Sequence, residues 1–111
     1  MGYKLIDIQN LFNNTFNFDN LKVKAEKNIR KTLMNEKNPI YKNYTQSEIK
    51  GIKNARIEYL NTKITVNTSK DKTIFILNFE LYTSDKIFSD YMYKVVYDYK
   101  GKFIDENLEK M

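Results

Sequence analysis

The clearest pattern in this chain is an alternation of apolar and polar residues in its second half. Four large apolar side chains share one parity: Phe75, Leu77, Phe79 and Leu81. The opposite parity is mixed: Ile74, Ile76, Asn78, Glu80 and Tyr82. Successive side chains of a strand point to opposite faces of a sheet, so this segment predicts a strand with one buried and one partly covered face.

The segments on either side predict further strands. In the first of them the apolar parity changes between Tyr59 and Ile64, which indicates a bulge at Leu60-Asn61. Polar turns are predicted at Asn67–Asp71 and Ser84-Asp85, and Lys100-Gly101 predicts a hairpin turn. We therefore expect three long strands and a short last one, at Ala55–Asn67, Lys72–Thr83, Ile87–Tyr99 and Lys102–Asp105.

The first half of the chain carries apolar residues at helical spacing. Tyr3–Asn13 predicts a short helix, and Asn20–Asn35 predicts a second one with Asp19 or Asn20 as its N-cap. The second helix has a stripe that repeats every four residues: Leu21, Ala25, Ile29 and Leu33. Pro39 ends it, and Thr45 to Glu48 form a capping box for a brief turn that we expect Gly51 to end.

These elements predict a single α+β domain over residues 1–111. Two N-terminal helices are expected to pack on a curved antiparallel sheet of three long strands plus a short last strand. The stripe of the second helix should cover the buried face of the Lys72–Thr83 strand.

Composition removes most routes to catalysis. The chain has no Cys and no His, and its three glycines form no phosphate-binding loop. Ser47 and Ser69 therefore have no histidine to activate them. Four acids fall at or near strand ends or on polar parity, where acids are ordinarily solvated: Asp85, Asp90, Asp98 and Asp105. We expect no enzyme activity, no metal and no cofactor.

Charge and aromatic residues suggest two contact surfaces. The net charge of +5 comes almost entirely from lysine, and Lys24, Lys27 and Lys31 share one face of the second helix. With only two arginines, we favour a solvated lysine face over a nucleic-acid site. Tyrosines also recur at alternate positions of the third strand. We favour a role for them in the core or in a protein interface over a role in stacking on nucleic-acid bases. Tyr82, Tyr91 and Tyr93 are candidate protein contacts, although parity leaves open whether Tyr91 and Tyr93 face the core.

The order of elements resembles a known superfamily. Four features carry the resemblance. They are a Phe-rich elbow at Phe16–Asp19, a helix that ends near Asn38–Tyr41, a bent first strand and a closing hairpin at Tyr97–Ile104. This order resembles the cystatin-like and nuclear-transport-factor-2-like α+β superfamily. Within it, the chain is most similar to extracytoplasmic domains of type IV secretion and conjugation scaffold proteins of Gram-positive elements, or to small cystatin-like lipoproteins.

The resemblance implies a non-catalytic domain that assembles with itself or with other parts of a conjugation or secretion apparatus. It also implies an extracytoplasmic location, reached through an N-terminal anchor or lipid that this sequence does not contain. Two alternatives stay open. One is an exported cystatin-like lipoprotein, and the other is a small cytoplasmic mobile-element protein that binds nucleic acid or a host protein.

Overall fold

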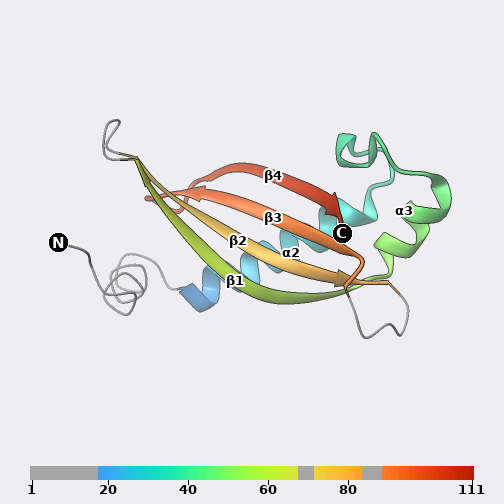
Figure 1. Cartoon of the computed structure of the whole chain (residues 1–111), viewed down its shortest axis with the longest axis horizontal. Helices are drawn as coiled ribbons and strands as arrows, with labels where there is room; N and C mark the ends of the chain where they lie inside the picture. The colour runs from blue at the N-terminus through green and yellow to red at the C-terminus, as the bar shows by residue number, and fades with distance from the viewer. Residues whose placement is uncertain (1–17, 68–71, 84–88) are drawn as a thin grey trace.

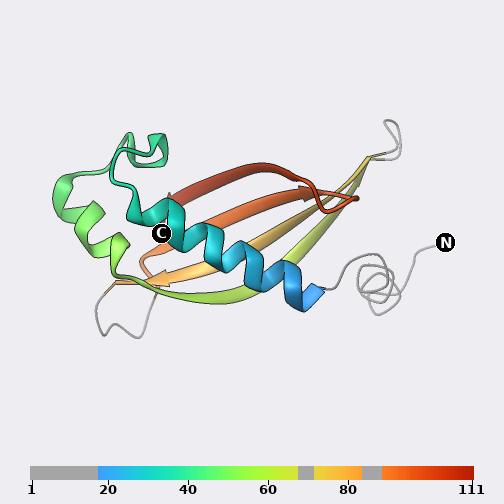
Figure 2. The ribbon, with the colours of Figure 1, turned by 180° about the vertical axis from the view of Figure 1, so that it is seen from behind.

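The computed structural model describes residues 18–67, 72–83 and 89–111. Helix α2 lies across one face of a four-stranded antiparallel sheet, and α3 lies at one end of it (Figures 1 and 2). The chain is therefore an α+β fold in which the described helices precede the sheet, as the pattern predicts. The predicted helix at Tyr3–Asn13 and the turns at 68–71 and 84–85 lie outside the described residues.

Helix α2 spans Phe18–Met34, so Asp19 and Asn20 lie in its first turn and do not precede it. The predicted stripe is buried: Leu21, Ala25, Ile29 and Leu33. A spacing of four residues returns a side chain to nearly the same face of a helix, which explains why these positions meet the sheet together. The side chains of Lys24, Lys27 and Lys31 are exposed.

Two short helices connect α2 to the sheet. The 3-10 helix η1 spans Pro39–Tyr41, and the side chain of Asn38 accepts a hydrogen bond from the Ile40 amide at its start. Helix α3 spans Gln46–Lys53, with the capping box between Thr45 and Glu48 formed as predicted. The predicted end at Gly51 is wrong, because Ile52 is fully buried and carries the helix onward.

One arginine joins the helices. The guanidinium of Arg30 in α2 donates to the carbonyls of Lys53 and Ala55, at 3.2 and 2.8 Å. These carbonyls belong to the last residue of α3 and to the residue just before the first strand. A charged donor at a helix C-terminus satisfies carbonyls that have no partner within the helix. Arg30 therefore ties α2 to the end of α3 and to the start of the sheet.

The sheet has the order β1-β2-β3-β4. Its strands are β1 (Arg56–Asn67), β2 (Lys72–Tyr82), β3 (Tyr91–Asp98) and β4 (Phe103–Lys110). The predicted bulge is confirmed, because Tyr59 pairs with Phe79 while Asn61 pairs with Asn78, which leaves Leu60 as the extra residue. The bulge lets both halves of β1 direct apolar side chains to the same face.

Two predicted strand boundaries are wrong. The third strand begins at Tyr91 and not at Ile87, and the last strand continues from Phe103 to Lys110 instead of ending at Asp105. The polar residues after Asp105 hide this strand in the sequence. Pairing with β3 forms it, and it places Leu108 opposite Tyr93 on the buried face.

The register aligns apolar side chains in rows across the inner face, which is the face covered by α2. One row contains Tyr59, Phe79, Tyr93 and Leu108, and another contains Ile64, Phe75, Tyr97 and Phe103. In the first row, the rings of Tyr59 and Phe79 meet edge to face with centroids 5.7 Å apart. Side chains paired across neighbouring strands stabilise a sheet. These rows form the surface on which α2 packs.

Replacing Leu77 with Ala should lower the free energy of unfolding by about 2–5 kcal/mol, because this fully buried side chain lies at the centre of the inner face. The matched control is Lys63→Ala, an exposed position on β1, for which we expect a change within about 0.5 kcal/mol. Urea denaturation followed by circular dichroism measures both values. Equal, small effects at the two positions would contradict the assigned inner face.

Candidate functional site

The three predicted tyrosines divide between the two faces of the sheet. Tyr91 lies opposite Leu81 and Tyr93 lies opposite Phe79, so both rings are buried on the inner face. They therefore cannot serve as contacts on the less covered face, because residues paired directly across two strands point to the same side. Tyr82 does lie on the outer face, half-buried, with the guanidinium of Arg56 4.5 Å from its ring centre.

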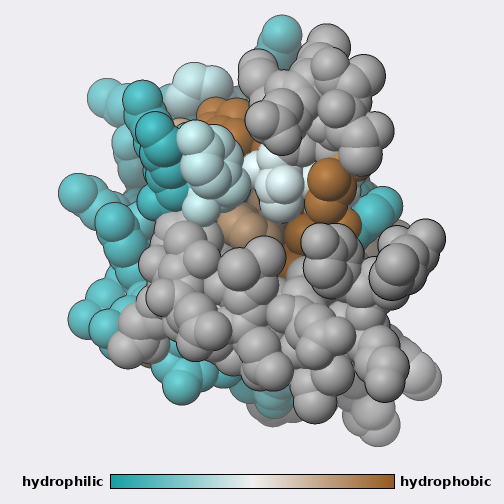
Figure 3. All heavy atoms as spheres, turned by 90° about the vertical axis from the view of Figure 1, so that its left-hand side faces the viewer, coloured by the Kyte–Doolittle hydropathy of each residue, from teal (hydrophilic) through white to brown (hydrophobic). Residues whose placement is uncertain are grey.

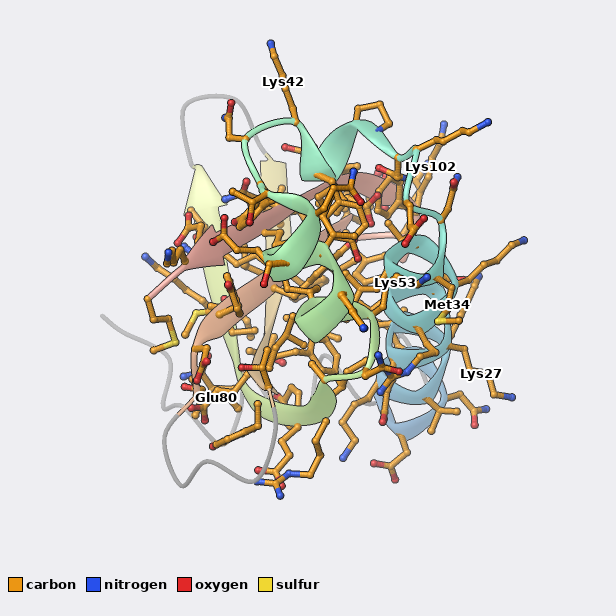
Figure 4. All side chains as sticks on the ribbon, turned by 90° about the vertical axis from the view of Figure 1, so that its right-hand side faces the viewer. Lys27, Met34, Lys42, Lys53, Glu80 and Lys102 are labelled. Atoms are coloured by element: carbon orange, nitrogen blue, oxygen red, sulfur yellow. The ribbon has the colours of Figure 1, made fainter. Side chains whose placement is uncertain are left out.

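The lysine face is separate from these tyrosines. Lys24, Lys27 and Lys31 are exposed on α2 and form no ion pair with any residue in the described ranges. Figure 4 shows Lys27 and Glu80 on opposite sides of the molecule, and Glu80 is the acceptor of the Tyr82 hydroxyl at 3.4 Å. The structure thus does not bring the predicted lysines and Tyr82 together into one site.

The described aspartates that the sequence singles out do not form a carboxylate cluster. Asp90 accepts a hydrogen bond from the Thr83 hydroxyl, and Asp98 accepts the amides of Lys100 and Lys102 at 2.8 and 2.9 Å in the β3–β4 turn. Asp105 is exposed, and Asp85 lies outside the described residues. Within the described part of the chain, no three His, Cys, Asp or Glu side chains gather in a way that would hold a metal ion.

An exposed apolar surface occupies the end of the sheet that carries the β3–β4 turn. Its four side chains retain about half or more of their accessible area: Val66 60%, Tyr99 51%, Phe103 49% and Ile104 50%. We call this set the hairpin-end surface. Gly101, with a φ of 80°, makes the tight turn that separates Tyr99 from Phe103. Figure 3, which views the molecule from this end, shows apolar side chains at the surface.

Element lengths explain why this end is not covered by α2. The 17 residues of α2 extend only about 26 Å at the usual helical rise. The 12 residues of β1 extend about 40 Å at the usual strand rise, so the sheet continues past the start of the helix (Figure 2). Sequence reasoning missed this surface, although the apolar pair Phe103-Ile104 directly after a Lys-Gly-Lys turn is a signal that points to it.

A second feature is an open groove of about 670 Å³ along the outer edge of β4, which we call the β4 groove. One wall consists of residues from the 38–44 segment, and the other of Glu106, Leu108 and Lys110. The Tyr44 hydroxyl bridges the walls by donating to the Leu108 carbonyl at 3.1 Å. Glu48 also lines the groove, and its pKa is lowered by the Thr45 amide and by Lys110, whose Nζ lies 3.2 Å away.

Glu106 connects this groove to the aromatic core. The Tyr93 hydroxyl donates to Oε2 of Glu106 at 2.6 Å. Burial raises the pKa of Tyr93 and so does the hydrogen bond to Glu106, because both disfavour the phenolate. The hydroxyl of Tyr97 is buried as well, and none of the described residues forms a hydrogen bond with it. Burial, followed by the nearby charge of Glu106, raises the pKa of Tyr97.

Comparisons with protein-family models, with curated proteins and with solved structures found no match. Among the described residues, no helix combines the length and the apolar character needed to cross a membrane. The hairpin-end surface and the β4 groove are therefore the candidate contact sites of the described residues.

Raising the pH should destabilise the fold by ionising buried tyrosines. Burial and the charge of Glu36 raise the pKa of Tyr41 from 10.0 to about 12, and its hydroxyl donates to the Leu33 carbonyl at 2.6 Å. The unfolded chain loses this proton near pH 10 and the folded chain keeps it, so the stability that neutral Tyr41 contributes is complete below pH 10 and is lost as the pH rises toward 12.

Urea denaturation at several alkaline pH values measures this loss. Tyr41→Phe should be less stable than the natural sequence at neutral pH, by about 1 kcal/mol, because the hydrogen bond is gone. Above pH 10 its stability should fall less steeply than that of the natural sequence. The fall should persist in part, because Tyr93 and Tyr97 also have raised pKa values. Identical slopes would show that Tyr41 does not contribute.

Proposed function

We propose that this chain is a non-catalytic protein-interaction domain that contacts its partner through the hairpin-end surface. The observation that carries the proposal is the exposure of Val66, Tyr99, Phe103 and Ile104 at one end of the sheet. Grouped apolar side chains at a protein surface mark contact sites more often than isolated ones do. Tyr and Phe are also enriched in the buried centres of protein interfaces.

The surroundings of these residues support a protein partner. Lys100 and Lys102 are exposed beside the apolar side chains, and the Lys100 ammonium lies 5.5 Å from the centre of the Tyr99 ring. An apolar centre with a polar and charged rim is the usual anatomy of a protein interface. Two of the four aspartates that were considered for acid–base chemistry have structural partners, because Asp98 accepts the amide of Lys100 in the turn and Asp90 accepts the Thr83 hydroxyl.

We propose further that the partner is a second copy of the chain or another component of a conjugation or secretion apparatus, outside the cytoplasm. This part depends on the resemblance of the element order to conjugation-scaffold domains. An anchor or lipid upstream of the chain would hold it at the membrane. An exported lipoprotein is the first alternative. The second is a cytoplasmic mobile-element protein.

Site-specific photo-crosslinking in the native cell tests the contact. A photoreactive amino acid at Phe103 should give adducts with one defined protein or with a second copy, identified by mass spectrometry. The matched control is Met34 on α2, which has a similar exposure of 55% but lies away from the hairpin-end surface. An identical adduct pattern at Phe103 and Met34, or no adduct at Phe103, would contradict the proposal.

The lysine face of α2 gives a separate expectation about nucleic-acid binding. We expect only weak attraction that falls with salt, because a lysine-rich chain with a net charge of +5 attracts phosphates without a dedicated site. Reversing Lys24, Lys27 and Lys31 to Glu should therefore weaken binding no more than reversing three exposed lysines elsewhere: Lys42, Lys50 and Lys63. Fluorescence anisotropy with labelled DNA measures both. A selective loss in the first variant would favour a nucleic-acid site on α2.

A further inference from the structure

The inner face of the sheet continues past the start of α2. The Lys22 ammonium lies 5.1 Å from the centre of the Tyr59 ring, so the first turns of α2 lie beside the bulge of β1 (Figure 2). Near the other end of the helix, the Arg30 guanidinium donates to the Ala55 carbonyl, just before β1 begins. The helix and the strand therefore run in opposite directions, and the part of β1 that contains Val66 extends beyond the helix.

Apolar side chains occupy this uncovered part of the inner face. Phe103 pairs with Tyr97, whose ring is buried on the inner face, and the two ring centres are 6.3 Å apart. Val66 follows Ile64 by two positions, so both side chains point to the same face. Ile64 packs against the core, whereas Val66 remains 60% exposed. Two members of the hairpin-end surface thus continue the core face beyond the point where α2 covers it.

The chain that leads into α2 arrives at this end of the sheet. The described residues begin at Phe18, and residues 1–17 precede it. For Tyr3–Asn13 the sequence predicts a helix with an apolar stripe of Leu5, Ile8 and Phe12. A helix of this length is about 16 Å long, and the strands extend on the order of 15 Å beyond α2 at the usual rises. The segment therefore matches the uncovered face in length and in apolar character.

Such a short helix needs a surface for its apolar stripe. Isolated helices of fewer than about 12 residues are marginal in water, and packing supplies most helical stability in proteins. The connection from Asn14 to Asn17 spans at most about 14 Å, which keeps the segment beside the end of the sheet where α2 begins. The remaining exposed large apolar side chains of the described residues are spread over α2, β1 and the last residue: Val23, Met34, Leu60 and Met111.

We propose that the apolar stripe of the Tyr3–Asn13 segment docks on the hairpin-end surface of the same chain, and that a partner must displace it there. Docking removes apolar side chains of both the segment and the surface from water, which favours the contact. The short connection to α2 gives the segment a higher effective concentration at this surface than a second copy of the chain has.

The docked segment is expected to be displaceable. Burial of its three apolar side chains favours docking, but the ordering of backbone and side chains opposes it. A partner that buries a larger area of the hairpin-end surface can therefore replace the segment. This displacement rests on the proposed function, which gives the hairpin-end surface a partner, whereas the docking itself does not.

A spin label in the hairpin turn tests the docking. The chain has no Cys, so a nitroxide can be attached at a single introduced cysteine, Lys102→Cys, an exposed position beside the hairpin-end surface. We expect the NMR amide signals of residues 3–13 to lose more than half of their intensity. The matched control is Lys42→Cys, an exposed position at the end of the sheet that carries α3, which should leave these signals unchanged.

The same label separates docking within one chain from docking between copies. Isotope-labelled chain with the natural sequence is mixed with spin-labelled chain that carries no isotope. We expect the signals of residues 3–13 to keep their intensity in this mixture. Their loss would show that the segment reaches a second copy, and it would overturn docking in the same chain.

Two substitutions that each add one negative charge assign the stripe. Ile8→Asp places the charge on the apolar side of the predicted helix, and Asn10→Asp places it on the polar side. Ile8→Asp should abolish the signal loss from the Lys102→Cys label and should raise the yield of adducts at Phe103 severalfold, because the competing segment has left the surface. Asn10→Asp should change neither value. Unchanged amide shifts in β2 and β3 would show that both variants keep the folded sheet.

Each result decides the proposal. Signal loss that disappears in Ile8→Asp and persists in Asn10→Asp supports the docking, and a higher adduct yield in Ile8→Asp supports the displacement. No signal loss in the natural sequence, or an equal loss in Ile8→Asp, overturns the docking. An unchanged adduct yield in Ile8→Asp overturns the displacement. Adducts at Phe103 without signal loss leave the proposed function standing alone, whereas signal loss without adducts leaves only the docking.

Discussion

The register of β1 on β2 is the constraint on which the rest of the structure depends. A shift of one residue moves every side chain of a strand to the opposite face, and here only one face is covered by α2. The bulge at Leu60 corrects the register within β1, so that Ile57 and Tyr59 before it and Ile64 after it all point inward. Without that extra residue, half of β1 would expose its apolar side chains and bury its polar ones.

Aromatic rings supply about half of the buried side chains on the inner face, and rings with hydroxyl groups bring polar atoms into the core. Tyr41 and Tyr93 direct theirs to the Leu33 carbonyl and to Glu106. Each such bond offsets the cost of removing a hydroxyl from water, which is why these tyrosines are tolerated there. The Tyr97 hydroxyl has no such partner within the described part of the chain.

The two candidate sites follow from the geometry of a helix laid on longer strands. A helix advances less than half as far per residue as a strand, so α2 does not reach the end of the sheet. That end retains the exposed side chains of Val66 and Phe103. At the other end, the connection through Pro39 and Tyr44 passes along the outer edge of β4 and leaves a groove beside it.

The sequence by itself determined the elements whose apolar spacing is strong. The four-residue stripe of α2, the alternation of β2, the parity change at Leu60 and the capping box of α3 all depend on local geometry, and each is confirmed. The local pattern did not predict the full length of β4. Glu106 and Asn107 are polar and have the sequence character of a solvated tail, and it is pairing with β3 that makes them part of a strand. The predicted end of α3 at Gly51 was also wrong, because the burial of Ile52 favours the helix more than the glycine disfavours it.

The face of Tyr91 and Tyr93 was decided only by tertiary structure, because parity relates residues within one strand and says nothing about which side a neighbouring helix covers. Pairing with Leu81 and Phe79 turned both rings inward. The meeting of Glu106 with Tyr93 and Tyr97 has the same origin. These residues belong to two strands, and only the β3–β4 register brings an acid beside two hydroxyls. Sequence spacing fixes which side chains of one element share a face, whereas the packing of separate elements decides what those faces meet.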